Sequence, residues 1–272
     1  MSPDENGFRQ NIYDGHKEHF DHLYRLHQLA QDSLRTYRGF TSNHYQAALV
    51  LIFPKAYKSF DSVRRLCEVA SCEDAAIVLR SLLNLLAVTR WITLDPLPRA
   101  MRYFAWYWVD MQHQYELHKD FFPPAWVKDV QQHYDSIKHL FEYKDKKGRT
   151  RMAKQWYEPQ ANTILDLFKQ VDLEKQYVEG YRPLSGIEHS DATAYFAMIA
   201  MAEKQENGRK LEIQSDLFVP HYLRNAFQYF GDIFKVCNKG IPLTDNEKLE
   251  EIVSAGMSFY EIDMRARGIA PF

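Results

Sequence analysis

Four side chains able to do acid–base or electrostatic chemistry lie close together in one short segment, at Arg182, Ser185, Glu188 and His189. A histidine can take or give a proton near neutral pH, and an arginine can stabilise negative charge developing on a phosphate oxygen. The sequence therefore predicts a candidate catalytic site made of these four residues. The open alternative is a structural histidine next to a helix-capping serine.

The surroundings of this segment favour chemistry. Pro183 and Gly186 interrupt the helical pattern, so we expect residues 182–191 to form an exposed loop between two helices. A helix is expected over 191–204, which places His189 next to its N-terminus. The positive end of a helix dipole favours the neutral imidazole, the form that a general base needs.

A second polar pair lies in the most apolar part of the chain, residues 73–94. Arg80 and Asn84 are four residues apart and so share one helix face. A helix that is apolar nearly all round belongs at the centre of a bundle, where an arginine must be paired or must line a wet cleft. We expect Arg80 to be largely buried and bonded, with segment 182–191 as the candidate partner, either as a structural residue or as an anion contact.

A basic stretch that ends in aromatic residues is the least helical part of the sequence. Cations bind phosphates and aromatic rings stack on bases, so this composition suits single-stranded nucleic acid. A solvated basic loop is the alternative. The candidate nucleic-acid-binding residues are Lys144, Lys146, Lys147, Arg149, Arg151, Lys154 and Trp156.

Other motifs for cofactors and metals are weak. The sequence contains no glycine-rich phosphate loop of the GxxxxGK[ST] or GxGxxG type and no HExxH pair. One cluster of potential metal ligands is present, but a metal needs three or four ligands that converge. We expect this cluster to form a solvated helix face instead. That cluster is His16, Glu18, His19, Asp21 and His22. We therefore expect no metal and no cofactor.

The elements that must position these residues are expected to be helices. Glycine and proline are sparse, at 11 each, apolar residues recur at three- and four-residue spacing, and no alternating strand is visible. The predicted fold class is all-α, a multi-helix bundle around a central apolar helix at about 73–94. The spacing predicts helices over 12–38, 43–70, 71–94, 99–120, 124–143, 160–170, 172–182, 191–204 and 216–237, and a final helix after a Thr244/Glu247 capping box.

Length and composition indicate one helical domain over residues 1–272. We expect a peripheral N-terminal helix over 1–40, a core bundle over 41–240 and a C-terminal capping helix over 241–272.

Three cysteines without a CxxC pair, and a start without a signal-peptide pattern, predict a cytoplasmic protein with no membrane contact. A net charge of −2 argues against a dedicated polyanion binder. Surplus aromatics over 103–126 predict a homodimer contact.

The string DAAIVLRSLLNLLAVTRWITLDP and the later string YVEGYRPLSGIEHSDA resemble the bacterial family known as domain of unknown function 5677. The resemblance covers roughly residues 44–235. Members of that family show an LLRSxxE helix followed by a Y…LS…H segment, and this chain has Asn84 at the position of the acid. The resemblance implies a helical fold.

The pair Arg182 and His189, with six residues between, also resembles the R-x(4–6)-H motif of helical HEPN ribonucleases; Pro183 departs from the pattern. That resemblance implies a metal-independent endoribonuclease, a toxin or phage-defence effector that acts as a homodimer on RNA. Histidine would take the ribose 2′-OH proton and arginine would stabilise the phosphorane. The rival hypothesis is a non-catalytic helical module that binds a small anion, or a partner protein encoded nearby, through an Arg80/Asn84 cleft. A third hypothesis is a purely structural scaffold.

Overall fold

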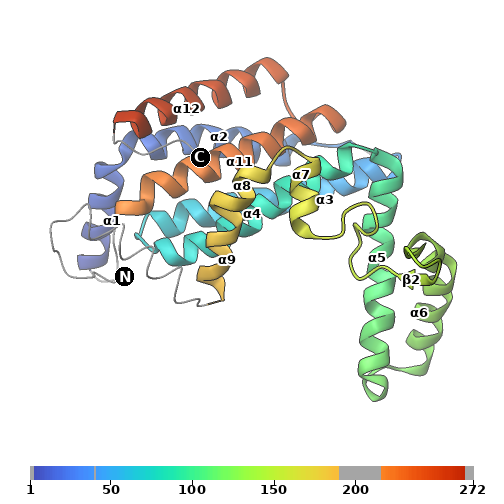
Figure 1. Ribbon diagram of the computed structural model, residues 1–272. Coiled ribbons are helices and arrows are strands. Elements are labelled where there is room, and N and C mark those ends of the chain that lie inside the picture. Colours follow the sequence, from blue (N-terminus) through green and yellow to red (C-terminus); the bar gives the residue numbers. More distant parts are fainter. Residues whose placement is uncertain (1–2, 40, 190–215, 267–272) are drawn as a thin grey trace.

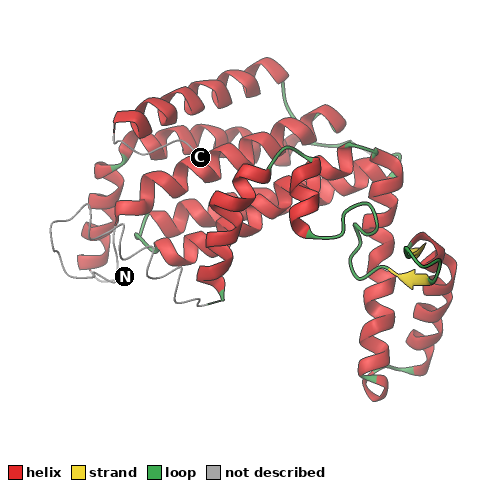
Figure 2. Ribbon diagram, viewed as in Figure 1, coloured by secondary structure: helices red, strands yellow, loops and turns green. Residues whose placement is uncertain are grey.

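Apolar side chains at helical spacing fold most of this chain into helices, and the computed structural model is 79% helical (Figure 2). It describes residues 3–39, 41–189 and 216–266. The prediction of an all-α multi-helix bundle is confirmed. Within those ranges the only β structure is one antiparallel hairpin, which pairs β1 (Glu142–Lys144) with β2 (Thr150–Met152).

The centre of the bundle is the apolar helix α4 (Cys72–Thr93), as predicted. It packs against α3 (His44–Cys67) and α11 (Val219–Gly240), and these two helices also pack on each other (Figure 1). Aromatic rings fill the contact between α3 and α11, with the Phe60 and Phe230 centroids 4.5 Å apart. By length and composition α4 could cross a membrane, but its sides are covered by other helices of the bundle.

The N-terminal segment forms two helices where a single helix over 12–38 is expected. Helix α1 (Pro3–Gly15) and helix α2 (Lys17–Thr36) are separated at His16. Helix α2 packs against α11 and α12 (Asn246–Ala266), and its Phe20, Leu23 and Leu26 are fully buried in the main core. The predicted Thr244 capping box is wrong: Asp245 Oδ1 accepts from the backbone N–H of Lys248 and caps α12.

An arm projects from one end of the bundle (Figure 1). It consists of α5 (Pro96–Leu117), η1 (Lys119–Phe121), α6 (Pro124–Ile137), η2 (Lys138–Leu140) and the β1–β2 hairpin. The arm has a small core of its own, made of Ala105, Val109, Phe141 and Ala153. Arg102 of α5 is buried and ties this core together, because its guanidinium donates to the backbone carbonyls of Leu140, Trp156 and Glu158.

The hairpin in the arm was not predicted because turn chemistry, not an alternating apolar pattern, forms it. Asp145 Oδ1 accepts from the backbone N–H groups of Lys147 and Arg149, at 2.9 and 3.0 Å. Gly148 has φ +72°, a conformation that glycine adopts without steric cost.

Helical backbone continues through the segment expected to be a loop. Helix α7 (Ile164–Gln170) and α8 (Glu174–Gln176) lead into a π-helix, η3 (Tyr177–Tyr181), which runs directly into α9 (Arg182–Glu188). The loop prediction for 182–191 is therefore wrong over Arg182–Glu188, because Pro183 stands where the π-helix meets α9 and helical backbone continues through it. The predicted helix over 191–204 lies outside the described residues. The short η4 (Asp216–Phe218) precedes α11.

Candidate functional site

Helix α9 presents the candidate catalytic residues on its outer face. Leu184 and Ile187 are buried against the bundle, where α9 packs on α4. Arg182, Ser185 and His189 lie within about 60° of one another around the helix axis, since they are three and seven residues apart. Arg182 and His189 are exposed, and Ser185 between them is half-buried. The structure therefore brings the three to one solvent-facing surface.

The two candidate catalytic groups differ in their partners. Arg182 has no hydrogen bond or ion pair with any residue in the described ranges, so its guanidinium faces solvent without an acid. The side chain of His189 is 72% exposed, and its Nε2 atom lies 3.8 Å from Glu188 Oε2. Glu188 is therefore an acidic neighbour of His189.

His189 lies at the C-terminal end of α9, and the helix expected over 191–204 lies outside the described residues. His189 follows α9 as its C-cap residue, and its backbone N–H donates to the carbonyl of Ser185 at 3.1 Å. The prediction that His189 adjoins the N-terminus of that helix therefore stays a prediction.

Glu188, the fourth candidate, contacts the central helix. Its carboxylate forms a short ion pair with Arg80 of α4, and Arg80 Nη2 also donates to the hydroxyl of Tyr181 at 3.0 Å. The Arg80 guanidinium stacks 4.7 Å from the centre of the Tyr181 ring, and its side chain is 20% exposed. The prediction that Arg80 is largely buried and bonded to this segment is confirmed. The pair joins α4 to α9 and fixes the orientation of α9.

The Arg80–Asn84 pair retains unused hydrogen-bonding groups. Arg80 Nε and Asn84 Oδ1 are both shielded from solvent and make no hydrogen bond within the described ranges. Because Glu188 already neutralises Arg80, the contacts favour a structural role for this arginine over that of a free anion contact.

The π-helix before α9 positions Tyr181 over Arg80. Tyr177 and Tyr181 stack with their ring centres 5.3 Å apart, and Phe168 of α7 packs against both rings. π-helical turns are rare and occur often at functional sites. This one was not predicted, since no sequence pattern distinguishes it from an ordinary helix.

The residues of the basic stretch have different surroundings in the structure: the two arginines are paired with an acid, and the lysines are exposed. Asp145 Oδ2 accepts from Arg149 and Arg151 at 3.0 and 3.2 Å, and the backbone N–H of Arg149 is the main reason that the pKa of Asp145 is lowered. Trp156 is half-buried, and its ring packs between Trp91 and Tyr103 at 5.0 and 5.1 Å, which ties it to the bundle more than to the exposed lysines. Four exposed lysines remain for phosphates: Lys144, Lys146, Lys147 and Lys154.

The histidine cluster near the N-terminus is partly buried, contrary to the solvated face that was expected. His16 and His19 are buried at the junction of α1, α2 and α12, with His19 Nε2 3.0 Å from Asp263 Oδ2 and His16 Nε2 3.4 Å from Asp216 Oδ2. In the ranges that the structure describes, no group of three potential ligands converges on a metal position.

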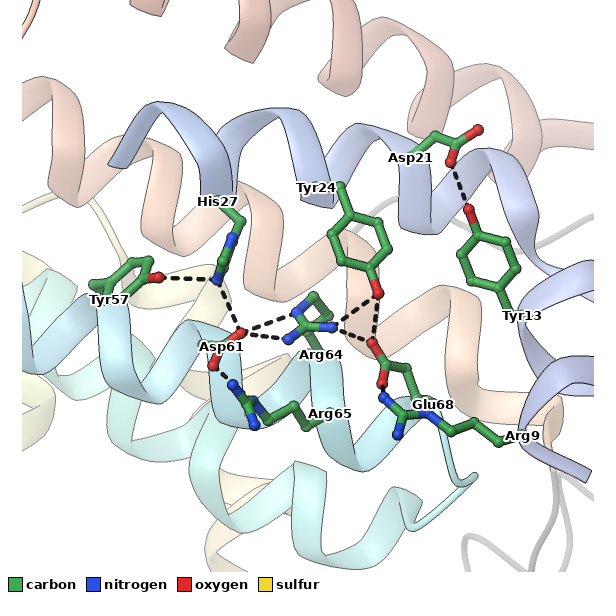
Figure 3. A network of polar contacts seen from close by, with 10 residues as sticks. All are labelled: Arg9, Tyr13, Asp21, Tyr24, His27, Tyr57, Asp61, Arg64, Arg65 and Glu68. Atoms are coloured by element: carbon green, nitrogen blue, oxygen red, sulfur yellow. Dashed lines mark hydrogen bonds and ion pairs between the residues drawn. The ribbon is translucent and has the colours of Figure 1, made fainter. Parts of the chain in front are cut away.

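One polar network was missed by the sequence interpretation (Figure 3). Glu68, only 2% exposed at the end of α3, accepts from Arg64 of the same helix, Tyr24 of α2 and Arg9 of α1. Arg64 donates in turn to Asp61, at 2.6 and 3.0 Å. The i, i+3, i+4 spacing of these charges on a largely apolar helix was the available signal.

The electrostatics of this network come from burial opposed by hydrogen bonds. Burial alone would raise the pKa of the Asp61 carboxyl, but hydrogen bonds from Arg64 and Arg65 outweigh it and leave that pKa lowered. Burial lowers the pKa of His27, which lies 3.1 Å from Asp61 and 2.9 Å from the Tyr57 hydroxyl. Every member has a partner, so the network joins α1, α2 and α3 and offers no free group to a substrate.

Comparison with known proteins identifies the family. A sequence model described as a family of unknown function, DUF5677, matches residues 46–207, more than half of the chain. The chain belongs to the DUF5677 family. The match covers α4, the arm and α9, and it ends before α11, short of the C-terminal limit at about 235 that the resemblance implied. No curated protein and no solved structure gives a significant match.

Proposed function

We propose that this protein is a metal-independent endoribonuclease of HEPN-like type, acting as a toxin or phage-defence effector, with Arg182 and His189 as catalytic residues. The observation that carries the proposal is the outer face of α9, which presents both groups to solvent while Leu184 and Ile187 anchor the helix. Arg182 lacks an acidic partner in the described ranges, so its charge is available to a phosphate.

The proposed reaction needs only these side chains. His189 takes the proton of a ribose 2′-OH, through Nδ1 because Nε2 is the nitrogen turned toward Glu188. The 2′ oxygen then bonds to phosphorus, the bond to the 5′ oxygen breaks, and the leaving oxygen takes up a proton from water. Arg182 stabilises the negative charge on the phosphorane. Glu188 stabilises the imidazolium that forms.

Helix geometry favours a site shared between two copies of the chain. Seven residues separate Arg182 from His189 by about 10 Å along the axis, and helical side chains lean toward the N-terminus, so Arg182 leans away from its own histidine. Two antiparallel copies of α9 would bring the arginine of each against the histidine of the other. Exposed apolar residues on the arm, including Tyr107, Leu117 and Phe121, support a homodimer contact.

The arm supplies the proposed RNA contact. Lys144, Lys146, Lys147 and Lys154 are exposed on and beside the hairpin and would bind phosphates without sequence preference. Such binding should weaken steeply as salt rises.

Cleavage of single-stranded RNA by the purified full-length chain in EDTA tests the proposal. His189→Ala should reduce the rate by about 10²–10⁴-fold, and the products of the unaltered protein should end in 2′,3′-cyclic phosphate. His139→Ala, which removes an exposed histidine of η2, is the matched control and should cleave normally. Undiminished cleavage by the His189→Ala protein would refute the assignment.

The second candidate is a non-catalytic module that binds a small anion or a partner protein at Arg80 and Asn84. The shielded Arg80 Nε and Asn84 Oδ1 atoms favour it, because a ligand could satisfy both. Overexpression separates the two: a ribonuclease should arrest growth and lose that effect in His189→Ala, whereas a binding module should leave growth unchanged in both forms.

A further inference from the structure

In the described part of this chain, the charge and N–H donors of a buried arginine are met either by carboxylates or by backbone carbonyls, with one exception. Arg64 is paired with Asp61 and Glu68, and Arg102 donates to three backbone carbonyls. Arg224 of α11 is 3% exposed, yet within the described ranges it makes one hydrogen bond, from Nη1 to the neutral Asn225 Oδ1 at 2.9 Å. Its Nε atom is shielded from solvent and has no acceptor.

No carboxylate compensates the charge of Arg224 in the described ranges. Glu261 of α12 acts on Arg224 electrostatically but forms no ion pair with it. Burial is the main reason that the pKa of the Arg224 guanidinium is lowered. A buried guanidinium whose Nε donor has no acceptor carries a desolvation penalty, which proteins rarely retain without a compensating charge.

We propose that Arg224 is the centre of a second anion site, separate from α9, that binds a small oxyanion of the phosphate class. A guanidinium offers two parallel N–H groups on an edge, which match two oxygens of a phosphate. Enclosure by the surrounding helices strengthens this attraction because the local dielectric is low. The site does not depend on the ribonuclease assignment.

The residues beside Arg224 hold its guanidinium in place for that role. Asn225 Oδ1 accepts from Arg224, and Asn225 Nδ2 contacts His221 Nε2 at 3.0 Å. This chain of contacts fixes one Nη atom and leaves the Nε edge for the anion. Arg224 therefore acts as the binding group, and Asn225 acts as a positioning residue.

Thermal unfolding of the full-length protein, in a low-chloride HEPES buffer with and without inorganic phosphate, tests the site. A ligand at 100 times its Kd shifts the folding equilibrium about 100-fold, which for a chain of this size raises Tm by about 5–10 °C. We expect that rise in the unaltered protein and its loss in Arg224→Met. Because Arg224→Met removes an uncompensated charge, its Tm without phosphate should equal or exceed that of the unaltered protein.

Arg182→Met is the matched control, since it removes an exposed arginine from α9. A phosphate shift that persists in Arg224→Met, or one lost only in Arg182→Met, would overturn the proposal, as would no shift in the unaltered protein. Arg224→Lys provides a second readout should the methionine variant not fold; an undiminished shift in it would also count against Arg224. A nucleoside 5′-monophosphate in a parallel titration distinguishes a phosphate monoester from free phosphate.

Discussion

Acidification should destabilise this protein through the half-buried imidazole of His221. The contact of its Nε2 atom with Asn225 indicates its protonation state. Arg224 can only donate, so Asn225 must turn Oδ1 toward it, and Nδ2 then faces His221 Nε2. That nitrogen must accept, so the imidazole is neutral. Burial, followed by the charge of Arg224, lowers the pKa of His221 to about 4.

The sign and size of the effect follow from that pKa. An unfolded histidine titrates near 6.5, so between pH 6.5 and 4 the unfolded chain binds more protons than the folded one. The stabilising contribution is complete above pH 6.5 and is lost as pH falls through this window. Between pH 8 and pH 5 the loss from His221 alone is about 2 kcal/mol, and it approaches about 3 kcal/mol at lower pH.

Urea unfolding followed by circular dichroism at pH 8, 7, 6 and 5 measures this contribution. His221→Gln cannot titrate and can still accept from Asn225, so its free energy of unfolding should fall about 2 kcal/mol less than that of the unaltered protein over this range. Other groups that titrate here, such as His22 and His27, are present in both proteins and cancel in the comparison. His139→Gln is the exposed control. Parallel pH curves for the unaltered protein and His221→Gln would refute the reasoning.

Two further predictions concern buried arginine contacts. Glu68→Gln should lower the free energy of unfolding by about 3–5 kcal/mol, since it leaves Arg64 and Arg9 beside a neutral amide; urea midpoints would measure this, and a change below about 1 kcal/mol would contradict it. Arg102→Met should destabilise the arm by about 2–4 kcal/mol, since three carbonyls lose their donor. Hydrogen exchange should then accelerate over residues 140–158 but not in α4, and uniform acceleration would argue against a local role.

The sequence identifies which residues carry the proposed chemistry but not the backbone that presents them. Arg182 and His189 were found from residue type and spacing, and Arg80 from being charged within an apolar helix. The expected loop became α9 because Pro183 fits the first turn of a helix as well as it ends one. His189 consequently stands at the C-terminal end of α9.

Local sequence determined the helices themselves. Apolar spacing and the Asp95–Pro96 break located α3, α4, α5 and α11 to within a few residues, because helix formation depends on contacts three and four residues apart. The apolar spacing did not predict the hairpin, because Asp145 and Gly148 form it through turn geometry.

Only the tertiary structure decided the long-range pairs. Glu188 is 108 residues from Arg80, and Glu68 is 59 residues from Arg9; no local pattern joins them. The same holds for Trp156, whose composition suits stacking on bases but whose ring packs against Trp91 of α4. Which side chains are buried, and which partners they contact, depends on how the helices pack in the folded bundle. The same packing buries Arg224 without a paired carboxylate in the described ranges.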